Sequence, residues 1–168
     1  MLHGMKIISQ HELEQLIAGA HVSPRKRQHL NIHHELTDPI QRLFVAFEPG
    51  TYVQPHRHPE AGKWELFILL KGEVAILLFD ERGRVTQRIT LAEQGANRLI
   101  EIPPQQWHTL ISLQPDSLCF ETKPGPYQPL ADKDFASWAP KENTARTDEF
   151  VRWFEHAQVG DTAPILNA

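Results

Sequence analysis

The sequence predicts an all-β protein, a double-sheet jelly-roll barrel with short helices near both ends. Between residues 42 and 123, short apolar or β-branched runs alternate with turn signals, at the spacing of about 8–12 residues typical of sandwiches and barrels. A chain of 168 residues with 40% hydrophobic content is long enough for one domain with its own core, and too short for two comfortable ones. We therefore expect a single barrel.

A short helix is expected at residues 9–20. Ser9 followed three positions later by Glu12 forms a capping box, which satisfies free backbone N–H groups at a helix start. Leu13, Leu16 and Ile17 then form an apolar stripe at helical spacing. This helix should pack on the barrel.

The next segment, SPRKRQHLNIHHEL, leaves two interpretations open. A run of basic residues is most often a solvated face. Alternatively, HLNIHH alternates as a strand does, which would place His29, Asn31 and His33 on one face and bring polar groups to a cavity. Both interpretations stay open at this point.

Eight runs read as strands, and eight strands fit a double-sheet jelly roll. Glycines in KGE (71–73) and ERG (81–83) allow the positive φ that tight hairpin turns require. The eight runs are RLFVAFE, TYVQPH, WELFILL, EVAILLFD, RVTQRITL, RLIEI, WHTLISL and SLCFETK.

Beyond Lys123 the chain is rich in proline, which excludes a central strand or a helix interior. We expect an ordered loop that wraps the barrel, anchored by Tyr127 and Trp138. The segment TDEFVRWFEHA then reads as a terminal helix, capped by Thr147 or Asp148. Its apolar face would consist of Phe150, Val151 and Phe154.

These elements divide the single domain into three parts. Residues 1–35 form an N-terminal helix and a basic, histidine-rich extension that packs on the barrel. Residues 36–125 form the jelly-roll barrel, and residues 126–168 form the proline-rich wrap and the terminal helix.

Composition argues against several classes of partner. A formal net charge of −4 does not suit nucleic acid, because phosphate binding needs a basic surface. No apolar run approaches the ~18 residues of a membrane span, and the first residues lack a secretory signal. We therefore expect a cytoplasmic protein. The single cysteine, Cys119, is expected to be a small buried hydrophobe.

The chemistry is expected to centre on a metal. His56 and His58 lie one residue apart, so their side chains share one face of a strand. Glu65 opens the apolar run LFILL, and His108 follows a Pro-Pro turn in another strand-like run. Three imidazoles and one carboxylate suit a divalent ion such as zinc, iron, nickel or manganese. We predict that these four residues are its ligands.

Glu60 is the rival carboxylate, because it shares the strand parity of the two histidines. Pro59 and the turn-forming Ala61-Gly62 indicate that the strand ends before it. Glu65 is therefore favoured.

Further candidates for the substrate site are Gln54, Lys63, Lys123 and Tyr127. Gln54 shares parity with His56, and Lys63 shares parity with Glu65. Lys123 and Tyr127 would lie at the mouth of the cavity. By the same alternation, Arg57 and Trp107 should point away from it.

The segment Gly50–Gly72 resembles the first cupin motif, G-x5-H-x-H-x3,4-E-x6-G. It departs in one respect, since six residues instead of three or four separate His58 from Glu65. Gly95–Ser112 resembles the second motif, G-x5-P-x-G-x2-H-x3-N, more loosely: Pro103 and His108 match, whereas Gln105 and Ser112 replace the glycine and the asparagine. The resemblance implies a cupin fold with a metal site.

Over roughly residues 23–141 the chain is similar to the WbuC family of cupin-fold metalloproteins, found near bacterial surface-polysaccharide genes. The segments that carry this similarity include SPRKRQHLNIHH, KWELF, IEIPPQQWHTL and ETKPGPYQPLADKDFASWAP. It implies that Asn31 and His33, in the first of these segments, are candidate substrate-binding residues. The leading hypothesis is a metalloprotein enzyme that acts on a small polar or anionic molecule such as a sugar derivative. Two alternatives stay open, an Fe(II)-dependent dioxygenase and a non-catalytic metal-dependent binding protein. Cupins also often pair through exposed sheet edges, which leaves a homodimer open.

Overall fold

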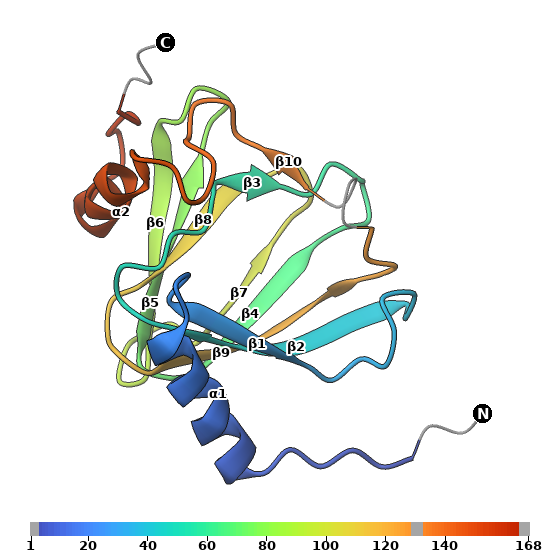
Figure 1. The fold of residues 1–168 in the computed structure, drawn as a ribbon. Helices are drawn as coiled ribbons and strands as arrows, with labels where there is room; N and C mark the ends of the chain where they lie inside the picture. The colour runs from blue at the N-terminus through green and yellow to red at the C-terminus, as the bar shows by residue number, and fades with distance from the viewer. Residues whose placement is uncertain (1–3, 129–132, 165–168) are drawn as a thin grey trace.

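The computed structural model describes residues 4–128 and 133–164. Two helices and ten strands make up this part of the chain (Figure 1). They are α1 (Gln10–Val22), β1 (Arg27–Asn31), β2 (Ile40–Phe47), β3 (His56–Arg57), β4 (Glu65–Lys71), β5 (Glu73–Phe79), β6 (Val85–Ala92), β7 (Leu99–Ile102), β8 (Trp107–Ser112), β9 (Ser117–Pro124), β10 (Asp134–Phe135) and α2 (Thr147–His156).

The strands form two five-stranded antiparallel sheets, in the orders β1-β2-β9-β4-β7 and β10-β3-β8-β5-β6. Seven of the eight predicted runs form strands at the expected places. The eighth, TYVQPH, joins a ladder only at His56; Pro55 just before it has no N–H to contribute. The two additional strands, β1 and β10, lie at sheet edges.

Helix α1 begins as predicted. The Ser9 hydroxyl accepts a hydrogen bond from the Glu12 N–H, and the Glu12 carboxylate accepts one from the Ser9 N–H. Leu16, Ile17 and Ala20 are buried against the outer face of the first sheet, in a cluster that includes Ala46 and Leu118. The capping box and this apolar contact together fix the helix on the barrel.

His21, in the last turn of α1, ties the helix to the ends of two strands. Its Nε2 lies 2.7 Å from the Asp116 carboxylate and 3.0 Å from the Glu48 carboxylate. Lys71 also reaches Asp116, at 3.0 Å.

The core has two main layers, because β5 is buried on both faces. Its even-numbered residues, such as Ile76, pack between the two sheets with Phe67 and Leu110. Its odd-numbered residues, such as Leu77, lie under α2. This double burial explains the continuous apolar run of β5.

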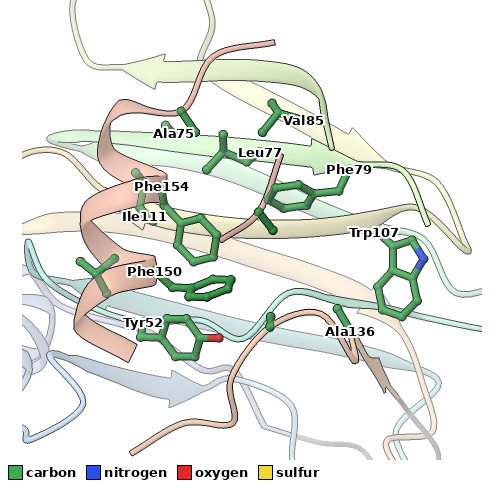
Figure 2. Packing of buried hydrophobic residues seen from close by; sticks show 14 residues of the cluster. Tyr52, Ala75, Leu77, Phe79, Val85, Trp107, Ile111, Ala136, Phe150 and Phe154 are labelled. Carbon is green, nitrogen blue, oxygen red and sulfur yellow. The ribbon is translucent and has the colours of Figure 1, made fainter. Parts of the chain in front are cut away.

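Helix α2 covers the outer face of the second sheet (Figure 2). Phe150 and Phe154 are fully buried there, and the Phe154 ring is stacked 6.0 Å from the Tyr52 ring. The predicted apolar face of α2 is therefore confirmed, together with Val151. The predicted cap is wrong: Arg146 is the N-cap without a side-chain cap bond. The Thr147 hydroxyl instead donates to the Thr144 carbonyl.

The two predicted hairpin glycines have positive φ, +80° at Gly72 and +79° at Gly83. Gly83 also has no room for a side chain, since a Cβ there would lie 2.7 Å from the Trp138 ring. The Trp138 ring packs 4.9 Å from that of Phe79. Trp138 therefore anchors the proline-rich segment to the barrel.

Within this segment, residues 129–132 lie outside the described ranges, as do residues 165–168 at the end of the chain. The short strand β10 extends the second sheet by pairing with β3. In the part of the chain that the structure describes, no helix has the length and apolar character needed to cross a membrane.

Candidate metal centre

The three histidines of the predicted site come from one end of the second sheet. His56 on β3 pairs directly with His108 on β8. His58 follows β3 by one residue and is 3% exposed, as is His56. Arg57 between them points the other way, as predicted, with its guanidinium 4.4 Å above the Trp107 ring.

Glu65 joins the histidines from the opposite sheet, as the first residue of β4. Its Oε2 lies 3.0 Å from His108 Nε2 and 3.6 Å from His58 Nε2. One ligand atom from each of His56, His58, Glu65 and His108 lies within 4.8 Å of the others. Glu60, the rival carboxylate, is exposed on the turn before β4. The structure thus brings Glu65 and not Glu60 to the histidines.

Two of the imidazoles are held by the main chain. Nδ1 of His56 lies 2.9 Å from the Gln54 carbonyl, and Nδ1 of His108 lies 2.9 Å from the Gln106 carbonyl. A carbonyl oxygen can only accept, so Nδ1 carries a proton in both rings; Nε2 of His56 then keeps its lone pair, and Nε2 of His108 faces the Glu65 carboxylate. This pattern turns the metal-binding nitrogens toward the cluster.

Nε2 of His56 is buried and has no hydrogen-bond partner among the described residues. Burial lowers the pKa of His56 well below its ordinary value, and Lys133 and His108 lower it further. A neutral imidazole with an unsatisfied buried nitrogen is the form that binds a metal ion. The four residues therefore fit a divalent ion by their donor types, their proximity and this unpaired atom.

A second buried ionic group supports Glu65. The Lys123 ammonium lies 3.1 Å from Glu65 Oε1 and 2.8 Å from Glu121 Oε1. Burial raises the pKa of Glu65, but Lys123 and the hydrogen bond with His108 outweigh it and hold the pKa well below its ordinary range. Burial raises the pKa of Glu121, and Glu65 adds to that rise against the opposing effect of Lys123. Glu65 is thus the carboxylate that stays ionised.

The sequence analysis did not single out Glu121, although the strand alternation contained the signal. Cys119, Glu121 and Lys123 share one parity along β9, and Cys119 lies in the core between the sheets. Glu121 must then also point inward. Cys119 itself is fully buried, as predicted, and burial raises the pKa of its thiol to about 12.

A cavity of about 480 Å³ opens beside the cluster, and His56, Glu65 and His108 form part of its wall. Among the predicted substrate-site residues, five line this cavity: Asn31, His33, Gln54, Lys123 and Tyr127. Lys63 is not among its lining residues. Its ammonium is directed instead at the carbonyls of Pro124 and Pro126, at 3.2 and 2.7 Å.

Charged residues missed by the sequence analysis lie at the same cavity, namely Arg25, Arg27, Lys133 and Glu142. Glu142 binds both arginines. Partial burial lowers the pKa of His29, and Arg25 and Arg27 lower it further. On this side of the cavity the basic residues Arg25, Arg27 and Lys133 therefore outnumber the single carboxylate of Glu142, which favours an anionic ligand.

The family model described as a domain of unknown function, DUF6016, matches residues 8–91, which is half of the chain. No curated protein sequence matches. Among solved structures, an oxalate oxidase in complex with the substrate analogue glycolate is similar, with 15% identity and a TM-score of 0.51. That alignment covers 68% of this chain and 57% of the oxalate oxidase chain.

The protein SO0799 from Shewanella oneidensis is similar with 12% identity and a TM-score of 0.52, over 64% of this chain and 72% of that chain. A cupin superfamily protein from Desulfitobacterium hafniense DCB-2 has 16% identity and a TM-score of 0.45, over 58% of this chain and 76% of that chain. At these identities the likeness to the oxalate oxidase and to SO0799 shows the fold alone. The fold is the cupin jelly roll, as the sequence predicts.

Proposed function

The chain belongs to the DUF6016 family of domains of unknown function, and we propose that it is a metal-dependent cupin that binds one divalent ion. The proposed ligands are His56, His58, Glu65 and His108. The observation that carries the proposal is their convergence from β3, β4 and β8 onto one buried point, with ligand atoms within 4.8 Å of one another.

The donor set determines what the ion would supply. Three neutral imidazoles and one carboxylate leave a divalent ion with a net charge of +1 and accept zinc, iron, nickel or manganese. When bound, such an ion polarises a coordinated oxygen atom of a ligand or lowers the pKa of a coordinated water. The protein's part is to hold the ligands, and Lys123 does so by fixing the Glu65 carboxylate from the side away from the histidines.

The proposed substrate is a small polar or anionic molecule. The cavity beside the cluster supports this, because Arg25, Arg27 and Lys133 outnumber Glu142 on one side of its wall, whereas Lys123 is already paired with Glu65 and Glu121. Asn31, Gln54 and Tyr127 add polar groups. The similarity to the WbuC family further suggests a sugar derivative linked to surface polysaccharides, in a cytoplasmic pathway.

Elemental analysis of protein purified without added metal tests the proposal. We expect close to one equivalent of a first-row divalent ion, and loss of most of it in each of the variants His56→Ala, His58→Ala and His108→Ala. His11→Ala on the exposed face of α1 is the matched control. Metal content near that of the wild type in any of the three variants contradicts the site.

A screen of the metal-loaded protein then separates the kinds of function. Turnover with oxygen consumption, and with iron as the required ion, would identify a dioxygenase. A ligand-induced rise in melting temperature without turnover would identify a binding protein, because binding to the native state stabilises it.

A further inference from the structure

His33 is part of the cavity wall and has one unsatisfied, buried ring nitrogen. The residue is 7% exposed and lines the cavity. Its Nε2 is buried and has no hydrogen-bond partner among the described residues. Leaving a buried polar group unsatisfied costs free energy, because its hydrogen bond to water is lost without replacement. A ligand in the cavity can supply the missing partner.

The other ring nitrogen shows which kind of partner Nε2 needs. Nδ1 of His33 lies 3.1 Å from the Arg42 backbone N and 3.0 Å from the Arg42 carbonyl oxygen. That carbonyl already accepts the backbone N–H groups of Ile32 and His33. The Arg42 N–H, in contrast, has Nδ1 as its acceptor. In the neutral ring Nδ1 therefore accepts, and Nε2 carries the proton and is a donor without an acceptor among the described residues.

This donor lies across the sheet from the metal cluster. His33 follows β1 and contacts β2 at Arg42, whereas Glu65 is on β4. The sheet order β1-β2-β9-β4 places three strand spacings between them. At ~4.8 Å per spacing this is at most about 14 Å, since the curvature of the sheet and inward-pointing side chains shorten the path. Lys123 on β9 lies between the two ends.

The span limits the size of the ligand. A metal–oxygen bond takes up ~2.1 Å and a hydrogen bond ~2.9 Å, which leaves at most about 9 Å for the ligand. An extended chain advances ~1.2 Å per bond. Six carbons with a terminal oxygen at each end therefore reach roughly 8 Å, whereas a two-carbon acid reaches less than half of that.

We propose that His33 is a specificity-determining residue that binds the far end of an extended, oxygen-rich anion whose near end lies at the metal cluster. The ligand class is a polyhydroxylated carboxylic acid of about six carbons. The Nε2–H group of His33 lacks an acceptor oxygen among the described residues, which the far end would supply, and a divalent ion that keeps a net charge of +1 among its four ligands favours a carboxylate at the near end. This inference rests on the proposed function, because it needs a metal-bound ligand.

Calorimetric titration of the metal-loaded protein with gluconate and with glycolate tests it. Both acids have a carboxylate beside a hydroxyl-bearing carbon, and they differ in length. We expect the wild type to bind gluconate more tightly than glycolate. The variant His33→Asn should weaken gluconate binding at least fivefold, equivalent to about 1 kcal/mol, and change glycolate binding less than twofold.

Asparagine is the informative substitution at this position. Its side-chain oxygen can replace Nδ1 as the acceptor of the Arg42 N–H, but it has no group at the place of Nε2. His34→Asn is the matched control, because His34 is exposed and is not among the residues that line the cavity. Gluconate binding by His33→Asn within twofold of the wild type overturns the inference, as does equal affinity of the wild type for the two acids.

Two measurements on the same samples keep this test separate from that of the proposed function. Nitrogen-15 NMR of the His33 ring should show a protonated Nε2 whose signal shifts with gluconate and not with glycolate; a protonated Nδ1 with a bare Nε2 would overturn the inference. Elemental analysis reports the ion independently. If the protein holds no ion, the proposed function fails. The ion-free protein is then titrated with gluconate, and the absence of binding that depends on His33 overturns this inference as well.

Discussion

Replacing Glu65 with glutamine should weaken metal binding strongly, whereas the same change at Glu60 should not. Both substitutions remove one negative charge and keep the shape of the side chain. Glu65 is 2% exposed and lies 3.0 Å from His108 Nε2. Glu60 is exposed on the turn before β4. The two variants therefore compare the loss of a carboxylate charge at the metal cluster with the loss of a carboxylate charge outside it.

The magnitude follows from the burial of the carboxylate. Two unit charges 4 Å apart attract each other by ~4 kcal/mol at an effective dielectric constant of 20, and a divalent ion doubles the attraction. Part of this is already offset, because Lys123 lies 3.1 Å from the same carboxylate and reduces its net charge at the ion. We expect Glu65→Gln to lower metal affinity at least tenfold, or about 1.4 kcal/mol. For Glu60→Gln we expect less than about threefold.

The assay is a competitive titration of each purified variant with a metal-binding dye, together with a thermal melt of the ion-free protein. Lys123 keeps Glu121 as a partner at 2.8 Å in Glu65→Gln, so the ion-free variant should remain folded. Equal affinities of the two variants would refute the assignment of Glu65. A larger loss in Glu60→Gln would transfer the ligand role to the turn.

Three further predictions concern stability. Chelation should lower the melting temperature yet leave the β-sheet circular dichroism, because the apolar core is self-sufficient; an unfolded ion-free protein at room temperature would contradict this. Phe154→Ala, at a fully buried ring, should cost ~3–5 kcal/mol of unfolding free energy, against less than about 0.5 kcal/mol for Val159→Ala at an exposed position. Lys71 and His21 lower the pKa of Asp116. The stabilisation from Asp116 should therefore be present above the unfolded-state pKa of 3.8 and fade as the pH falls below it. In urea unfolding, Asp116→Asn should accordingly destabilise the protein more at pH 6 than at pH 3.

The features that local rules determine could be predicted from the sequence. The capping box of α1 depends on Ser9 and Glu12 alone. The opposite directions of His56 and Arg57 depend only on strand alternation. The preference for Glu65 over Glu60 depends on where a strand begins and a turn ends, which Pro59 indicates directly. In each case the determining residues are neighbours in the chain.

Features that depend on pairing between distant segments could not be predicted in this way. The strand β10 forms because residues 134–135 pair with β3, and nothing in their own sequence indicates a strand. Lys63 was expected near the cavity because it shares the parity of Glu65. Its ammonium instead binds the carbonyls of Pro124 and Pro126, at and just after the end of β9. The orientation of His33 depends on the Arg42 N–H of β2, a contact that the alternation of HLNIHH does not contain.

The arrangement of the interior in rows explains how one barrel holds buried charges and a stable core. Across the first sheet, Gln41 pairs with Lys123, and Lys123 binds Glu65. In the next row Glu121 pairs with Leu43 and Phe67, and the row after it consists of Val45, Cys119 and Leu69. On the inner face of this sheet, the polar side chains are therefore confined to the two rows nearest the metal cluster.

The apolar rows below continue into the core between the sheets, and α2 covers a separate core on the other side of β5. Substitutions of polar residues at the cavity wall therefore leave most of the buried apolar surface intact, and with it most of the hydrophobic free energy of folding. This separation is what allows His33→Asn and Glu65→Gln to be interpreted as changes in binding. It also means that the ligand preference of such a barrel can change through residues of β1 and the wrap without a change in fold.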